Sequence, residues 1–264
     1  MVTCQDILTA LEDFAPVSLA YDWDNCGLLA GDKNRNVKNV LVCLDCDLNV
    51  LEEAKAKNID MILSHHPAIF NEVKRFDEEH YNGRLIKTLL QSNICYYAGH
   101  TNIDAAKGGL NDMLAEKIGL SSPCGVMEKI GENDGIGRIF ELSSPITIEA
   151  LCQKIKAGLH TECLSYTGEL SKQVKKIALC SGGGDSFSSL ALDAHCDVYV
   201  SGDFHHNKGI ECLGDGMSLI DVSHYDSEII VKEVFARVLT KAFGNELSII
   251  FSEANTPVFH TFLG

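Results

Sequence analysis

Short apolar runs alternate with amphipathic segments along most of the chain. Runs rich in β-branched residues predict strands at 37–44, 59–63, 94–98, 137–142, 163–166, 176–180, 197–200, 218–222 and 247–251. Apolar residues at helical spacing predict helices at 48–57, 83–92, 110–118, 148–159 and 226–243, and a first helix that Thr3 caps. Strands that alternate with helices are typical of βαβ units. The pattern therefore predicts an α/β fold with mostly parallel sheets.

A turn-rich segment at 121–133 is the predicted boundary between two α/β lobes, because Ser-Ser-Pro and Gly-Glu-Asn-Asp-Gly occur there. We assign residues 1–127 and 229–264 to the first lobe and residues 128–228 to the second. No repeat of fixed period relates the two lobes as copies.

Charge and hydropathy exclude several classes of protein. The 264 residues include 22 Lys and Arg against 37 Asp and Glu, a net charge of −15, which disfavours nucleic-acid binding. No apolar stretch approaches the ~18 residues of a membrane span. The N-terminus lacks a basic leader, and acidic residues interrupt its apolar ones, so we expect no secretory signal and a cytoplasmic protein.

Eleven cysteines are spread along the chain, mostly within apolar runs. This odd number and even spread indicate reduced, buried thiols rather than a disulfide framework. Cys43 and Cys46 form a lone CxxC at the end of a predicted strand, and we interpret them as packing residues.

Polar residues gather directly after five predicted strands, at 64–67, 99–104, 181–186, 201–206 and 223–228. In parallel α/β sheets ligands bind outside the carboxyl ends of the strands, where such loops converge. The pattern therefore predicts one site built from several loops.

Three of these loops carry residues that bind metals. His65 and His66 are adjacent, so in an extended loop their rings point in different directions and suit two ions, unless the loop holds no ligand. His224 and Glu228 are four residues apart on a predicted helix and share a face; an exposed helix N-terminus is the alternative. Asp104 can bridge two cations. Together these residues fill most of a dinuclear site.

The sequence allows two interpretations for each of the other two polar loops. The glycines at 182–184 could approach a phosphate through backbone N–H groups or form a tight turn for packing, and the Lys of a Walker A loop is missing. His205 and His206 could line the crevice or begin a helix. Isolated histidines are interpreted as structural: His80, His160, His195 and His260.

Six motifs follow one another in a distinctive order: Trp-Asp-Asn-Cys-Gly-Leu at 23–28, Ser-His-His-Pro-Ala-Ile-Phe at 64–70, His-Thr-Asn-Ile-Asp at 100–104, the glycines at 182–184, Ser-Gly-Asp at 201–203 and His-Tyr-Asp-Ser-Glu at 224–228. From about residue 3 to residue 260, the chain resembles the GTP cyclohydrolase 1 type 2 homologues, the Nif-three-like dinuclear metal proteins. The Ser-His-His-Pro and Thr-Asn-hydrophobe-Asp motifs are specific in combination.

The resemblance implies two interlocked α/β lobes of the Nif-three-like fold and a toroidal homohexamer. It also implies two divalent metal ions per chain, of Zn, Fe or Mn, with the two carboxylates shared between them. The implied ligands are His65, His66, Asp104, His224 and Glu228.

For function, the resemblance implies a metal-dependent hydrolase that acts on a nucleotide-like small molecule, because two cations lower the pKa of a water toward ~7. Taken literally, the family name implies opening of the guanine ring of GTP, with His100 as the candidate proton carrier. Phosphoester hydrolysis would use the same ligands. The alternative is a metal-binding ring without activity, acting as a carrier, regulator or assembly partner.

Overall fold

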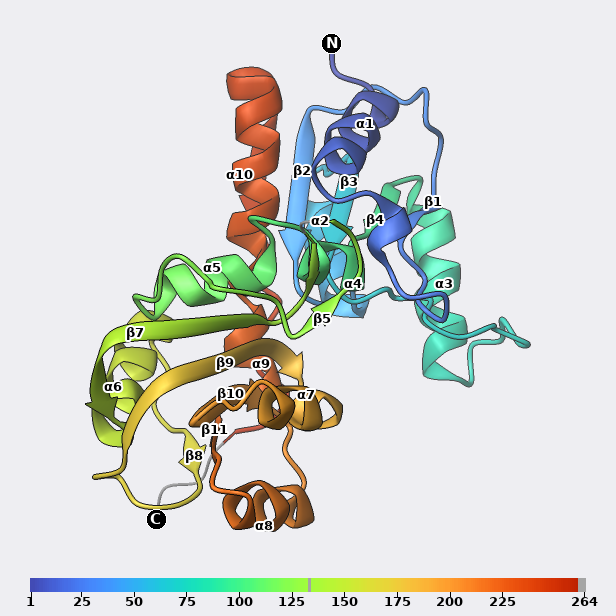
Figure 1. Cartoon of the computed structure of the whole chain (residues 1–264). Coiled ribbons are helices and arrows are strands. Elements are labelled where there is room, and N and C mark those ends of the chain that lie inside the picture. Colours follow the sequence, from blue (N-terminus) through green and yellow to red (C-terminus); the bar gives the residue numbers. More distant parts are fainter. Residues whose placement is uncertain (133, 261–264) are drawn as a thin grey trace. The chain divides into compact units, whose positions relative to one another are not determined.

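The computed structural model describes residues 1–132 and 134–260, and the chain divides into two compact α/β units (Figure 1). The first contains Met1–Ala106 and Val231–Val258, and the second contains Lys107–Ile230 together with Phe259 and His260. The first unit ends earlier than the predicted boundary at residue 127. Helix α5 (Leu110–Lys117) packs against strand β9 (Gln173–Gly183) and therefore belongs to the second unit.

Five strands form the sheet of the first unit, in the order β1-β4-β3-β2-β12. Four of them are parallel and match predicted runs: β2 (Asn39–Cys43), β3 (Met61–Ser64), β4 (Cys95–Ala98) and β12 (Ser248–Phe251). The fifth, β1 (Gly27–Ala30), is antiparallel to β4 and was not predicted. All its residues are half-buried, so its two faces are equally covered. Such a strand shows no alternation of apolar and polar residues, which is the pattern that predicts a strand from sequence.

Helix α1 (Cys4–Phe14) begins at the predicted cap. Asp6 N donates to Thr3 Oγ1 at 3.3 Å and Thr3 N donates to Asp6 Oδ2 at 2.8 Å, which completes a capping box. This helix packs against α10 (Val231–Phe243), and α10 also contacts β2. The C-terminal segment of the chain thereby returns to the first unit.

The main core of the first unit lies between its sheet and a pair of helices, α2 (Leu48–Ala56) and α3 (Tyr81–Ser92). Alternate strand residues such as Leu41 and Ile62 face this core. Cys43 and Cys46 are part of it, and burial raises the pKa of the Cys46 thiol to about 12. All eleven cysteines of the chain are free, as predicted, and the CxxC serves packing.

The sheet of the second unit has the order β7-β9-β10-β11-β8. β9, β10 (Val198–Gly202) and β11 (Ser218–Asp221) are parallel, whereas β7 (Arg138–Thr147) and β8 (Ser165–Tyr166) are antiparallel edges. β9 extends three residues beyond its predicted end at 180 and includes two glycines of the glycine-rich segment. Pairing with β10 holds this extension, although glycine alone weakens a strand.

The helices of the second unit include α6 (Ile148–Leu159), whose bounds match the prediction. The predicted helix at 226–243 is confirmed in α10, which ends at Phe243, but it is not continuous, because α9 (His224–Glu228) ends before α10 begins at Val231. Since α9 belongs to the second unit and α10 to the first, the chain leaves one unit at this break. The remaining elements are α4 (Thr101–Ala105) in the first unit and α7 (Ser188–Asp193), α8 (His206–Gly214), β5 (Glu128–Lys129) and β6 (Gly135–Ile136) in the second.

Short 3₁₀ helices occur at Val17–Leu19, Asp185–Phe187 and Gly244–Glu246. Within the described ranges, every helix is too short or too polar to cross a lipid bilayer.

Candidate metal centre

Three histidines meet at the carboxyl edge of the first unit's sheet, and we call them the histidine cluster: His65, His66 and His100. The first two follow β3 and the third follows β4, and these neighbouring strands are parallel, so their ends coincide. The ring centroids lie 5.1 to 5.5 Å apart. One ligand nitrogen from each ring lies within 4.8 Å of the others, a spacing that can hold a metal ion.

Each ring of the cluster is oriented through Nδ1, which bonds to an oxygen of the protein. The acceptors are the carbonyl of Gly99 for His65 at 2.8 Å, Asp45 for His66 at 2.7 Å and Asp24 for His100 at 2.9 Å. An Nδ1–H that donates to a carbonyl or carboxylate leaves Nε2 as the nitrogen with a lone pair. The three rings are therefore in the tautomer that binds a cation through Nε2.

Asp24 is held as an anion beside His100. Burial alone would raise the pKa of Asp24, but hydrogen bonds from His100 and Thr101 outweigh it and hold that pKa well below its usual range. Thr101 donates through both Oγ1, at 2.6 Å, and its backbone N, at 3.1 Å. We did not predict this role, because 76 residues separate Asp24 from His100 and spacing carries no signal at that distance.

Asp104 lies on α4, with Oδ1 3.6 Å from His65 Nε2. This distance is too long for a hydrogen bond. Bonds of about 2.0–2.2 Å to one ion place two of its ligands about 3–4 Å apart, so these two atoms are spaced as ligands of a common cation.

The second unit holds the other predicted pair on α9. His224 and Glu228 share a face as expected, with Nε2 2.9 Å from Oε2, and the side chain of Glu228 is only 4% exposed. Asp203 Oδ2 lies 2.8 Å from His224 Nδ1, so this histidine too presents Nε2. A buried carboxylate beside an imidazole Nε2 is a donor set that suits a divalent cation.

The glycine-rich segment surrounds this pair. Gly182 has a φ of +66°, and a Cβ there would lie 2.0 Å from Glu228 Oε1. Its backbone N donates to Ser227 Oγ at 2.9 Å, and Gly184 N donates to the carbonyl of Gly202 at 3.3 Å. Gly182 and Gly183 end β9 rather than form a tight turn, and the amides of Gly182 and Gly184 already donate to protein acceptors, so the contacts favour a packing role over phosphate binding.

His205 and His206 begin helix α8, and His205 caps it. Both are exposed and line a cavity of about 510 Å³ with Tyr166 and Ile210. His205 Nδ1 also lies 3.3 Å from Asp185 Oδ2. The helix-start interpretation is therefore confirmed, whereas the cavity that these residues line contains none of the proposed metal ligands.

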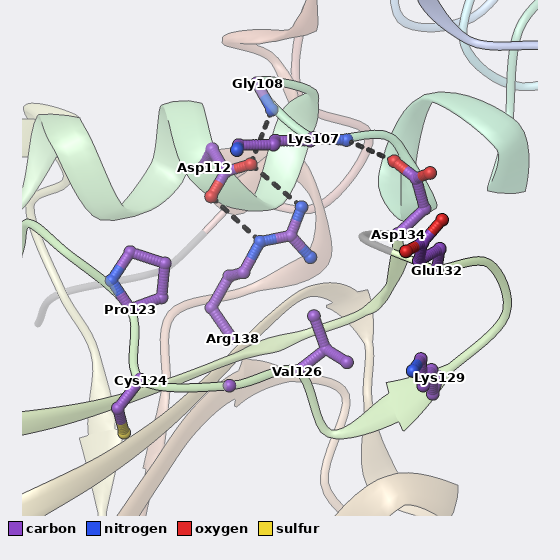
Figure 2. Close-up of a pocket in the computed structure, with 11 residues that line it drawn as sticks. Lys107, Gly108, Asp112, Pro123, Cys124, Val126, Lys129, Glu132, Asp134 and Arg138 are labelled. Atoms are coloured by element: carbon purple, nitrogen blue, oxygen red, sulfur yellow. Dashed lines mark hydrogen bonds and ion pairs between the residues drawn. The ribbon is translucent and has the colours of Figure 1, made fainter.

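Figure 2 shows a larger cavity of the second unit, of about 740 Å³, around the buried Arg138. The guanidinium donates twice to Asp112, each time at 2.8 Å, and also to two backbone carbonyls. The carboxylate of Asp134 accepts from the backbone N of Lys107 at 2.9 Å. Because Asp112 neutralises the Arg138 guanidinium and Asp134 accepts from a backbone amide, we place the candidate centre at the histidines instead.

Comparisons with known proteins agree with the motifs. The sequence model of the Duf34/NIF3 (NGG1p interacting factor 3) family matches residues 2–257. A Clostridium perfringens protein named GTP cyclohydrolase 1 type 2 homolog is 34% identical over 256 residues, which are 96% of this chain and 97% of that protein. A Lactococcus lactis protein of the same name is 30% identical, over 97% of this chain and 98% of its own.

Solved structures extend this agreement to the fold. The Staphylococcus aureus hypothetical protein SA1388 superimposes with a TM-score of 0.90 at 29% identity, covering 98% of this chain and 99% of that one. Reduced HcgD from Methanocaldococcus jannaschii gives a TM-score of 0.82 at 28% identity, covering 96% and 98%. Since sequence and fold match over nearly the full length, this chain belongs to the Duf34/NIF3 family.

Proposed function

We propose that this protein is a metal-dependent hydrolase in which His65, His66, Asp104, His224 and Glu228 bind two divalent cations. The names of its relatives point to a nucleotide-like substrate. The observation that carries the proposal is the shared orientation of the histidines. Each of the four imidazoles, His100 included, has Nδ1 bonded to a protein oxygen, which is how proteins orient histidine ligands.

The donor set fits divalent cations. Imidazole nitrogens and carboxylate oxygens together suit Zn, Fe or Mn. Gly182 supports this fit, because its missing side chain leaves room for the carboxylate of Glu228 beside His224. The chain thus keeps this buried anion where a cation would compensate its charge.

In the proposed reaction the bound cations supply Lewis-acid activation of water and substrate. Asp104 and Glu228 would hold the cations through their carboxylate oxygens, and Asp24 accepts from His100 Nδ1, which makes Nε2 the nitrogen that carries the lone pair in the neutral ring. That nitrogen can accept a proton from the attacking water and return it to the leaving group. His100 lies as near to His65 and His66 as these lie to each other, so the proton carrier is close to the proposed ligands.

Metal content tests the proposal. Elemental analysis of anaerobically purified protein should find about two divalent ions per chain in the wild type. Asp104→Ala should lose most of them, because it removes a shared oxygen ligand. His80→Ala is the matched control, since His80 caps α3 and pairs with Asp77 at 2.6 Å. Equal metal content in all three proteins would refute the assignment.

Turnover separates the hydrolase from the non-enzymatic alternative. Nucleotides and phosphoesters are screened with the metal-loaded wild type and with the same preparation after chelation. A hydrolase shows turnover in the first sample alone. A loaded protein that hydrolyses none of them would favour a carrier or regulator.

A further inference from the structure

Aromatic side chains border the histidine cluster, and we call them the aromatic rim: Tyr21, Trp23 and Phe70. Tyr21 stacks on Trp23 with ring centroids 5.3 Å apart and an interplanar angle of 17°. Trp23 and Phe70 meet at 61°, with centroids 5.9 Å apart. Both lie edge-on to the ring of His100, at 6.3 and 6.2 Å. The rim is therefore continuous with the histidine cluster through His100.

The rim is unusual in its exposure. Trp23 is 59% exposed and Phe70 is 45% exposed, although large aromatic side chains are normally well buried. Tyr21 covers one face of the indole, so the accessible surface of Trp23 lies on its other face and outer edge. An accessible aromatic face beside a polar site suits the stacking of another planar ring.

The loops that carry the rim are fixed before any ligand arrives. Asn25 Nδ2 donates to the carbonyl of Ile69, which ties the Trp23 loop to the Phe70 loop. Tyr21 N donates to Thr101 Oγ1 at 3.2 Å. Trp23 also precedes Asp24, the residue that orients His100. A ring that stacks on Trp23 therefore meets a preorganised surface at a set position relative to the histidines.

We propose that the aromatic rim binds a planar heteroaromatic ring by stacking and holds it beside the histidine cluster. The inference rests on the proposed function, because it assigns the substrate class of the same site. A stacked base is recognised by its π-face, which needs no charged partner in a chain whose net charge is −15. A protein partner on the rim would instead cover the approach to His100.

Trp23 provides the test, because it is the only tryptophan of the chain. Guanosine and adenosine, titrated into the metal-loaded protein, should quench its fluorescence saturably, whereas ribose should not. By calorimetry, Trp23→Leu should weaken nucleoside binding by about tenfold or more, the loss expected for one stacking partner. Trp23→Phe should keep most of the affinity. Phe76→Leu is the matched control, since Phe76 is also 59% exposed and lies outside the rim.

The outcomes separate this inference from the metal proposal. Metal content is measured on every variant, and the titration is repeated after chelation. Nucleoside binding that depends on Trp23, in a wild-type protein that is purified without metal and takes up none, would support the rim and refute the metal proposal. Two ions per chain without saturable quenching would overturn nucleoside binding by the rim and leave the metal proposal intact. A smaller native mass for Trp23→Leu by light scattering would also overturn nucleoside binding, since the rim would then be a contact between copies.

Discussion

At the residue scale, oxygens outside the proposed ligand set orient the histidines. Asp24 and Asp45 in the first unit and Asp203 in the second each accept from an Nδ1 at 2.7 to 2.9 Å. Such partners fix the tautomer and raise the basicity of the free nitrogen. The chemistry of this site therefore depends on carboxylates that lie outside the predicted ligand set.

His100→Ala tests the proton carrier. The variant should keep about two ions per chain, because the five proposed ligands remain, and hydrolysis of the best screened substrate should fall by about 10²- to 10⁴-fold. Elemental analysis and steady-state turnover measure the two effects. His206→Ala, an exposed histidine of α8, is the control. Unchanged turnover would exclude His100 as the carrier, and lost metal would make it a ligand.

Gly182→Ala tests the close packing around Glu228. A Cβ at this position would lie 2.0 Å from Glu228 Oε1, and the φ of +66° strains any side chain. We expect a loss of about 1–3 kcal/mol in the free energy of unfolding, together with reduced metal content. Gly214→Ala is the control, because a Cβ there meets nothing within 4 Å. Its free energy of unfolding and its metal content should stay near the wild-type values. Full metal content in Gly182→Ala would contradict a role of this close packing in metal binding.

At the element scale, helix α2 anchors the turn that follows β12. Glu53 accepts from Ser252 Oγ at 2.6 Å and from the backbone N of Glu253 at 3.0 Å, and Lys57 lies 2.7 Å away. Burial alone would raise the pKa of Glu53, but the hydrogen bonds from Glu253, Lys57 and Ser252 lower it to about 2. One carboxylate thus joins two elements that lie far apart in sequence.

This pairing predicts a pH-dependent stability. A carboxyl group with a lowered pKa in the folded state stabilises the fold above its unfolded pKa of about 4.3 and loses that contribution as pH falls toward 2. Glu53→Gln should cost about 1–2 kcal/mol at pH 7. The difference from wild type should shrink below pH 4.5 in urea unfolding series. A difference that stays constant down to pH 3 would contradict the ionic role of Glu53.

At the scale of the whole molecule, the chain forms two units, and the first is completed by a segment that follows the second in sequence. β12 adds to β2 in parallel and α10 packs on α1, so the segment Val231–Val258 closes the first unit. The family resemblance adds a proposal at this scale, that six copies assemble into a ring. No charge run opposes such assembly, because acidic and basic residues are interspersed along the chain.

The homohexamer is tested by native mass. Light scattering at micromolar concentration should give a mass of about six chains of 28.8 kDa each. The measurement is repeated after chelation, to learn whether assembly needs the metal. A monomer in both conditions would refute the ring.

Most elements and the proposed ligands could be predicted from the sequence because their signals are local. Hydrophobic spacing located α6 to the residue, and the polar motifs after β3, β4 and β11 located His65, His100 and His224. The strand β1 and the break between α9 and α10 could not be predicted this way. The residues of β1 are all half-buried, so apolar and polar residues do not alternate there. Across 226–243 the helical spacing of apolar residues continues without a gap, although α9 and α10 belong to different units.

The sequence by itself determined the α/β class, the family and the candidate ligands, since each rests on residues within a few positions of one another. Only the tertiary structure decided which oxygens orient the histidines, why Gly182 must be glycine and where the aromatic rim lies. Those contacts join residues separated by 20 to 80 positions, such as Asp24 and His100. Pairing of the strands, antiparallel for β1 with β4 and parallel for β3 with β4, brings such residues together, and no spacing along the chain encodes it.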